Sequence, residues 1–236
     1  MGILVGTRVA GSDHSASTGV SESFTIGTVS PAAFWILYHN NTLSSFTWNG
    51  VAPDTLVSVQ NVVTNTNVSL ALYRNPAQGT LNALPTFAGA VNYKIFLLTT
   101  TGGNTTTQNR TTYTQKDEGS GPAGPGLTVV DSQNGDLVMH GAHVNSSSIT
   151  FDGGEDTTST EVDNFVLDGT SIGVSTKAAT GANTVVGCTD VAFYAEIAMA
   201  LIPATSGPGS GTDSLPVQSS DVARPVTVTL SIQESG

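Results

Sequence analysis

Residues 32–52, AAFWILYHNNTLSSFTWNGVA, decide the fold. An aromatic and aliphatic block, residues 34–38, is followed by a polar interruption, and a second apolar block, residues 43–48, ends at Asn49-Gly50. Both blocks have the length of a strand and are rich in residues that favour β-structure, and Asn-Gly is the strongest short turn signal. The stretch therefore predicts two core strands of a β-sandwich joined by a polar turn.

Short β-forming runs separated by turn residues continue along the chain, and no run is convincingly helical. Residues 191–202 contain Ala and Met, which favour helix, but their apolar positions alternate with period two up to Pro203 and so favour a strand. About a dozen short strands predict an all-β fold, an antiparallel β-sandwich or jelly roll. The other predicted strands lie within residues 24–28, 55–65, 68–74, 91–99, 111–115, 127–131, 135–143, 148–151, 164–168, 171–175 and 225–233.

The two ends of the chain differ from this body. A Gly/Ser/Pro-rich linker precedes the alternating strand 225–233, which can return to its own sheet or add to the sheet of a neighbour. The same two alternatives hold for residues 1–10. We expect an N-terminal arm at 1–23, a jelly-roll β-sandwich at 24–203, and a linker with a C-terminal strand or arm at 204–236.

Charge excludes several classes of partner. The chain carries 7 Lys and Arg against 18 Asp and Glu, a net charge of −11. A phosphate backbone would be repelled, so we expect no nucleic-acid binding, and an anionic membrane surface is disfavoured for the same reason. The N-terminal residues lack the pattern of a secretion signal, and no window has the length of a membrane span.

Few residues suggest metal or redox chemistry. The single cysteine, Cys188, cannot form a disulfide within the chain, and its β-like context predicts a buried small apolar residue. His140 and His143 would face opposite sides of a strand, so ordinary surface or partly buried histidines are favoured over a metal pair. The acidic loop 152–156, with Asp152, Glu155 and Asp156, offers oxygen ligands for calcium but matches no known calcium-loop spacing.

The sequence contains no catalytic signature. The string 207–211, GPGSG, matches Gly-x-Ser-x-Gly, but it lies in the linker and lacks the strand-to-helix context of a nucleophile elbow. There is no phosphate-binding glycine loop with its lysine, and no carboxylate pair can be assigned across a sugar. We therefore expect a non-enzymatic protein with no catalytic, cofactor-binding or metal-binding residues.

Sugar binding is the main alternative that the residues leave open. Sandwich modules can bind glycans through exposed aromatic and amide side chains, although the strand pattern favours core positions for both tryptophans, Trp35 and Trp48. The candidates are Tyr38, Trp48, Tyr73 and Tyr113 among the aromatics, and Asn40, Asn41 and Asn49 among the amides.

Several short sequence motifs along the chain resemble those of a known module in their order. They are FWIL at 34–37, SFTWNGVA at 45–52, LYRNP at 72–76, GDLV at 135–138 and AEIAMALIP at 195–203. This order resembles a jelly-roll module of tailed-phage virion surface proteins that is also found in some bacterial surface proteins. The resemblance spans about residues 24–203 and implies a β-sandwich displayed on a particle or cell surface, without catalytic residues.

From the resemblance we expect a structural protein on the virion surface. It would be a capsid decoration (cement) protein or a spike subunit, with the major capsid protein or other virion proteins as partners. By analogy we expect a homo-oligomer, with a closed trimer favoured, whose arms at 1–23 and 204–236 reach neighbouring subunits. The alternative is a carbohydrate- or receptor-binding module for a host-surface glycan.

Overall fold

The chain folds as an all-β antiparallel sandwich, as predicted. A computed structural model describes residues 3–27, 31–106, 110–117, 127–146, 160–187 and 193–204. Every regular element in these residues is a β-strand, and the strands form sheets of six, five, three and two strands. No helix in the described part of the chain is long and apolar enough to cross a membrane.

Two large sheets form the body of the sandwich. The central sheet has the order β1-β9-β4-β7-β6, and β2 pairs with the same strand as β1. Its strands are β1 (Leu4–Ala10), β2 (His14–Ser17), β4 (Ala32–His39), β6 (Thr55–Gln60), β7 (Thr66–Tyr73) and β9 (Val91–Thr101). The facing sheet has the order β10-β16-β12-β14-β13. Its strands are β10 (Thr112–Asp117), β12 (Leu137–Val144), β13 (Thr160–Leu167), β14 (Thr170–Ala178) and β16 (Tyr194–Leu201).

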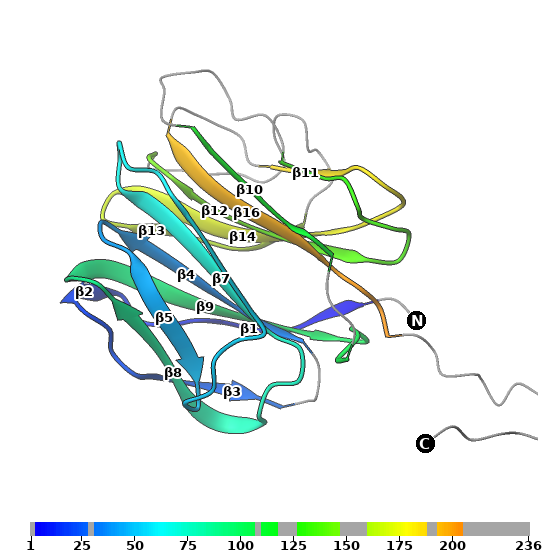
Figure 1. Ribbon diagram of the computed structural model, residues 1–236, viewed down its shortest axis with the longest axis horizontal. Helices are drawn as coiled ribbons and strands as arrows, with labels where there is room; N and C mark the ends of the chain where they lie inside the picture. Colours follow the sequence, from blue (N-terminus) through cyan, green and yellow to red (C-terminus); the bar gives the residue numbers. More distant parts are fainter. Residues whose placement is uncertain are drawn as a thin grey trace, which may run out of the picture. The chain divides into compact units, whose positions relative to one another are not determined.

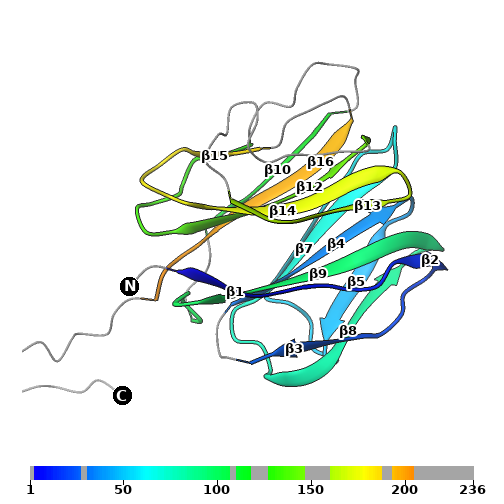
Figure 2. The ribbon, with the colours of Figure 1, turned by 180° about the vertical axis from the view of Figure 1, so that it is seen from behind.

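Two smaller layers cover the outer faces of these sheets. The outer sheet, β3-β8-β5, covers the central sheet and consists of β3 (Glu22–Ile26), β5 (Leu43–Trp48) and β8 (Gly79–Phe87). The outer ribbon, β11 (Leu127–Val129) with β15 (Thr184–Val186), covers part of the facing sheet. Figures 1 and 2 show the layers in the order outer sheet, central sheet, facing sheet and outer ribbon.

This layering explains the unbroken apolar run at β4. Trp35 and Leu37 contribute to the core between the central and facing sheets, and Phe34 and Ile36 contribute to the core beneath the outer sheet. A strand with one face in water alternates apolar and polar residues, whereas a strand covered on both faces is apolar throughout. Burying each large side chain contributes about 1.5–3 kcal/mol, so β4 stabilises both cores at once.

The two strands predicted within residues 32–52 exist, but they lie in different sheets. β4 pairs with β7 and β9, whereas β5 pairs with β8. Between them Asn40 and Asn41 adopt left-handed backbone angles, with φ of 57° and 50°. Asparagine tolerates this conformation better than most residues, so the polar turn carries the chain from the central sheet to the outer sheet.

The predicted Asn-Gly turn is confirmed. Asn49 and Gly50 both have positive φ, 52° and 76°, and the flanking residues Trp48 and Val51 exchange backbone hydrogen bonds of 2.9 and 3.0 Å. Two left-handed residues between a bonded pair are the mark of a tight two-residue turn.

The N-terminal residues belong to the sandwich. β1 pairs with β9 of the same chain, and β2 pairs with the continuation of β9. Residues 4–17 therefore lie in the body rather than in a separate arm, because the free edge of β9 takes up their backbone hydrogen-bonding groups. Cys188 and residues 205–236, which include the predicted C-terminal strand, lie outside the described residues.

Other boundaries differ from the sequence prediction. The strand predicted at 55–65 ends at Gln60, and Val62 and Val63 are exposed in the turn that follows. β2, β8 and β15 were not predicted. These strand orders do not confirm the expected jelly-roll connectivity.

Candidate functional site

The aromatic residues considered for sugar binding are core residues. Tyr38, Trp48 and Tyr73 are all buried. Nε1 of Trp48 donates to the Ala77 carbonyl at 3.0 Å, and the Tyr73 hydroxyl donates to the Val51 carbonyl at 2.8 Å. Their polar tips are therefore used within the fold, and none of the three presents an open ring face for stacking on a sugar.

An apolar recess lies beside two of these aromatic side chains. It has a volume of about 470 Å³ and is lined by Trp48, Val51, Tyr73 and residues 75–78. Burial raises the pKa of Tyr73 above its ordinary value. Because the Tyr73 hydroxyl and the Trp48 indole already have partners, this recess offers mainly apolar contact.

The two histidines lie on opposite faces of β12, as predicted, but both are fully buried. The expectation that they are surface or partly buried residues was wrong, because β12 is an inner strand of the facing sheet and is covered on both faces. His140 lies 3.3 Å from the Ser175 hydroxyl and 3.8 Å from a carboxylate oxygen of Glu196. These are the residue types of a hydrolytic triad, but Ser175 is completely buried, so no substrate reaches its hydroxyl.

His143 joins the central sheet to the facing sheet. Its Nδ1 donates to the Asn67 carbonyl at 2.9 Å, and its Nε2 lies 2.9 Å from the Thr170 hydroxyl. The same hydroxyl lies 3.1 Å from Nε2 of His39, whose ring packs edge-on against that of His143. Burial, and next the charge of His39, lower the pKa of His143 to about 3. His143 is therefore neutral, and its bonds to Asn67 and Thr170 are polar contacts within the core.

Metal binding finds no support in the described residues. They contain no group of three or more His, Cys, Asp or Glu side chains that could hold an ion. Asp152, Glu155 and Asp156 of the candidate calcium loop lie outside the described residues, as does the side chain of Tyr113.

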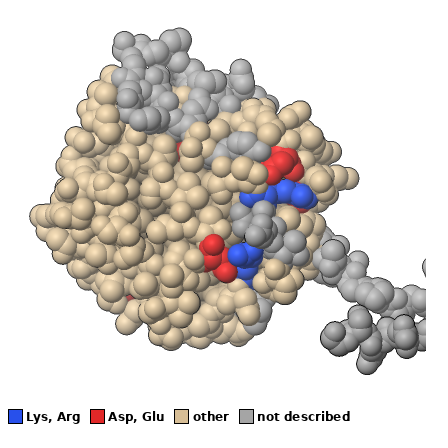
Figure 3. Space-filling view, in the orientation of Figure 1, with Lys and Arg blue, Asp and Glu red and all other residues tan. Residues whose placement is uncertain are grey.

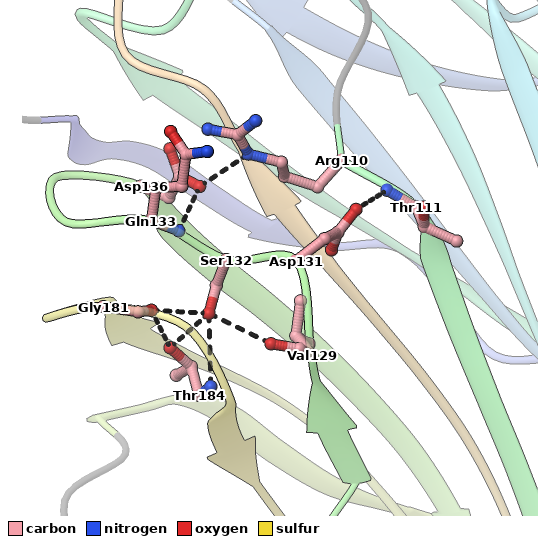
Figure 4. Close-up of polar contacts among 9 residues, drawn as sticks. All are labelled: Arg110, Thr111, Val129, Asp131, Ser132, Gln133, Asp136, Gly181 and Thr184. Atoms are coloured by element: carbon pink, nitrogen blue, oxygen red, sulfur yellow. Dashed lines mark hydrogen bonds and ion pairs between the residues drawn. The ribbon is translucent and has the colours of Figure 1, made fainter.

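A polar cluster holds the loop that precedes β12 (Figure 4). The buried Asp136 carboxylate accepts hydrogen bonds from Nε of Arg110 and from the Gln133 amide, both at 2.9 Å. The Ser132 hydroxyl lies 2.7 Å from the Thr184 hydroxyl and accepts a bond from the Thr184 amide. The Asp136 carboxylate therefore holds the loop to Arg110, which precedes β10, and the Ser132 hydroxyl joins the start of β15 to the residues after β11.

A second recess is lined almost entirely by amides, and we call it the amide recess. It has a volume of about 130 Å³ and lies beside the end of β4 and the turn between β6 and β7. That turn is the cyan loop in Figure 1. None of the described residues that line it is charged. Its lining consists of Asn40, Asn41, Thr42, Gln60, Asn61, Val62, Asn65 and Asn67.

Backbone geometry and hydrogen bonds hold the amide recess in shape. Asn40, Asn41 and Asn65 have positive φ, and the Asn40 amide donates to the Asn65 carbonyl at 3.2 Å. Nε2 of Gln60 donates to the Asn41 carbonyl at 3.2 Å, and Nδ2 of Asn41 donates to the Ala90 carbonyl at 3.0 Å. The turns after β4, β6 and β8 therefore support one another around the recess.

Asn67 contributes a buried acceptor to this recess. The residue is 3% exposed, and its Nδ2 donates to the Asn65 carbonyl at 3.3 Å. Its Oδ1 is buried, and no group in the described part of the chain donates a hydrogen bond to it. A buried carbonyl oxygen without a donor costs about 1–3 kcal/mol, so this atom is the main unsatisfied polar group of the recess.

Sequence reasoning found only part of this site. It singled out Asn40 and Asn41, but it grouped them with Asn49, which lies in the turn after β5 and does not line the recess. The density of amides in residues 60–67, QNVVTNTN, was the available signal for the remainder.

Comparison with protein-family models, with curated proteins and with solved structures finds no match to this chain. The function must therefore be argued from the residues and their geometry.

Proposed function

We propose that this protein is a non-enzymatic structural protein of a phage virion, a capsid decoration (cement) or spike subunit that binds neighbouring subunits at the particle surface. The observation that best supports assembly is the edge strand β6, with the sequence TLVSVQ. Among the described residues only β7 pairs with it. Its outer backbone groups are therefore a template for another strand.

The other edges are protected in ways that β6 is not. β1, β2, β5 and β13 each contain a break in register. β3 carries Glu22, and β10 carries Lys116 and Asp117. Charges and bulges on edge strands are common devices against unwanted pairing. Apart from the three-residue strands of the outer ribbon, β6 is the one described edge strand with unbroken register and no charge.

The sequence also predicts a strand suited to such an edge. Residues 225–233, PVTVTLSIQ, alternate apolar and polar side chains, carry no charge and follow a Gly/Ser/Pro-rich sequence typical of linkers. An isolated strand must pair its backbone groups, and addition to β6 of a neighbouring copy or of another virion protein would do so. A cyclic repeat of this exchange closes into a ring, and a trimer remains the favoured oligomer.

A structural role also agrees with the surface and the histidines. Figure 3 shows that most of one face carries neither basic nor acidic side chains. The grouping of His140, Ser175 and Glu196 is buried within the layers. These observations, together with the resemblance of residues 24–203 to phage surface modules, favour a rigid body that contacts other proteins.

The test uses one substitution on the β6 edge and a matched control. Leu56 on β6 and Leu84 on β8 are both 38% exposed, but β8 is the middle strand of the outer sheet, pairing with β3 through residues 79–83 and with β5 through residues 83–87. Leu56→Lys places a charge at the pairing edge, whereas Leu84→Lys places the same charge on a sheet face. Mass in solution is measured by light scattering for the full chain, for both variants and for a chain ending at residue 203.

The proposal predicts an oligomer for the wild-type chain and for Leu84→Lys. It predicts a smaller mass for Leu56→Lys and for the truncated chain, with unchanged thermal unfolding of the body. A wild-type chain that stays monomeric at micromolar concentration, or equal masses for all four proteins, would refute assembly through this edge.

A further inference from the structure

We propose that the amide recess binds one neutral sugar residue of a glycan. This inference does not depend on the virion role, because it rests on side chains in the turns after β4 and β6 and not on the outer backbone groups of β6. The proposed site differs from the aromatic residues that the sequence offered as candidates for sugar binding.

The buried Oδ1 of Asn67 is the first argument for a ligand. This oxygen is fixed, because Nδ2 of the same side chain donates to the Asn65 carbonyl. Oδ1 can therefore accept one hydrogen bond, but less than 1 Å² of this atom is exposed, so a side chain at the rim must shift before a ligand hydroxyl can donate to it. That bond recovers the cost of about 1–3 kcal/mol that a buried acceptor without a donor carries.

The lining selects the chemical class of the ligand. Amide side chains both donate and accept hydrogen bonds, as sugar hydroxyls do, and the recess carries several of them together with the Thr42 hydroxyl. Among the described residues no Lys or Arg lines the recess to bind a carboxylate or phosphate, and the net charge of −11 repels anions. In the described part of the chain no acidic residue lines it to bind an amine. The ligand is therefore neutral and rich in hydroxyl groups.

Val62 supplies the apolar contact that a sugar ring also needs. Its side chain lines the recess and is 66% exposed, so it stands at the rim. A pyranose ring presents C–H groups on its faces, and contact with the valine methyl groups removes apolar surface of both from water. Asn40 and Asn65 are exposed on the same rim and can bond ring hydroxyls.

The size of the recess limits the ligand to one residue. Its volume of about 130 Å³ is well below the ~300 Å³ at which pockets for drug-sized ligands begin. A single shallow subsite of this kind gives weak binding, with a Kd of about 1 mM. Several copies on one particle would strengthen attachment to a glycan-covered surface through multivalency.

The test removes amides without changing the backbone. Asn40 and Asn65 have positive φ, which glycine adopts freely, so Asn40→Gly with Asn65→Gly removes two rim amides and retains the turns. Asn49→Gly is the matched control, because Asn49 also has positive φ and lies in the turn after β5. The probes are the methyl glycosides of glucose, galactose, mannose, N-acetylglucosamine and N-acetylneuraminic acid.

Binding is followed by NMR titration of the side-chain amide signals of the full-length protein. The proposal predicts saturable shifts with at least one neutral glycoside, about tenfold weaker binding in the double variant, and unchanged binding in Asn49→Gly. Binding of the anionic glycoside alone would overturn it. No saturable shift with any neutral glycoside, or equal affinity of the double variant and the wild type, would do the same.

Discussion

The indole ring of Trp35 lies directly against the backbone of Gly141. Trp35 belongs to β4 of the central sheet and Gly141 to β12 of the facing sheet, and both lie in the core between these sheets. A Cβ atom on Gly141 would lie 2.5 Å from Cζ3 of Trp35 and closer still to Cε3. The missing side chain at residue 141 therefore sets the distance between the two large sheets at this point.

We expect Gly141→Ala to destabilise the protein. Trp35 is completely buried and cannot move aside, so the added methyl group must displace backbone in one of the two sheets. Overpacking of this kind costs about 1–3 kcal/mol. Urea unfolding should show this loss in the free energy of unfolding, and the near-ultraviolet circular dichroism of Trp35 should change with it.

Gly181→Ala provides the control for that substitution. A Cβ atom at residue 181 meets no atom within 4 Å, and the backbone there is not left-handed. The added methyl group should leave the protein within about 1 kcal/mol of wild type or slightly more stable. Equal losses for Gly141→Ala and Gly181→Ala would mean that contact with Trp35 does not limit the sheet spacing.

The turn at Asn49-Gly50 should depend on the left-handed preference of its residues. Asn49→Val places a β-branched residue at a φ of 52°, which should lower the free energy of unfolding by about 1–2 kcal/mol. Asn49→Gly should lose much less, because glycine adopts this angle freely. Thermal unfolding of the two variants checks the order, and a valine variant as stable as the glycine variant would contradict it.

Sequence patterns predicted strands well where they are apolar, and poorly where they are not. β4 and β16 were found because β-forming or alternating residues mark them over their full length. β8, with the sequence GTLNALPTF, was missed because it is weakly apolar and contains Pro85. The pairing with β3 ends at Ala83, so Pro85 faces a strand partner on one side only and its missing amide hydrogen breaks no ladder.

Layering and the candidate site could not be predicted in the same way. The apolar run of β4 indicates burial, but it does not say which sheet covers each face. The amide recess combines residues 40–42 with residues 60–67, which meet because β4 and β7 are antiparallel neighbours with His39 opposite Thr66. That pairing is a long-range property, and no local pattern in either segment specifies it.

Ser132 should be important for holding the two strands of the outer ribbon together. Its hydroxyl contacts the Val129 and Gly181 carbonyls at 3.0 and 2.8 Å and accepts from the Thr184 amide at 3.2 Å. Ser132→Ala leaves that buried amide without its acceptor, which should cost about 1–3 kcal/mol. Hydrogen exchange of the Thr184 amide should accelerate before the body of the protein unfolds.

Ser23→Ala is the comparison for Ser132→Ala. The Ser23 hydroxyl donates to Asn82 at 2.8 Å, but both residues are exposed and water replaces the lost bond. Its effect should stay within about 0.5 kcal/mol. If Ser132→Ala has an equally small effect, the polar cluster at residues 129–136 does not hold the outer ribbon together.

His143 should make the protein less stable as the pH falls. Its pKa is about 3 in the folded state and about 6.5 in the unfolded chain, so between these values the unfolded chain binds more protons. The free energy of unfolding therefore falls with decreasing pH in this window, by up to about 1.4 kcal/mol per pH unit from this residue. Urea unfolding at pH 7 and pH 5 should show a loss about 2 kcal/mol larger in the wild type than in His143→Gln. The same pH dependence in both proteins would contradict this assignment, because the remaining titratable groups are common to the two chains.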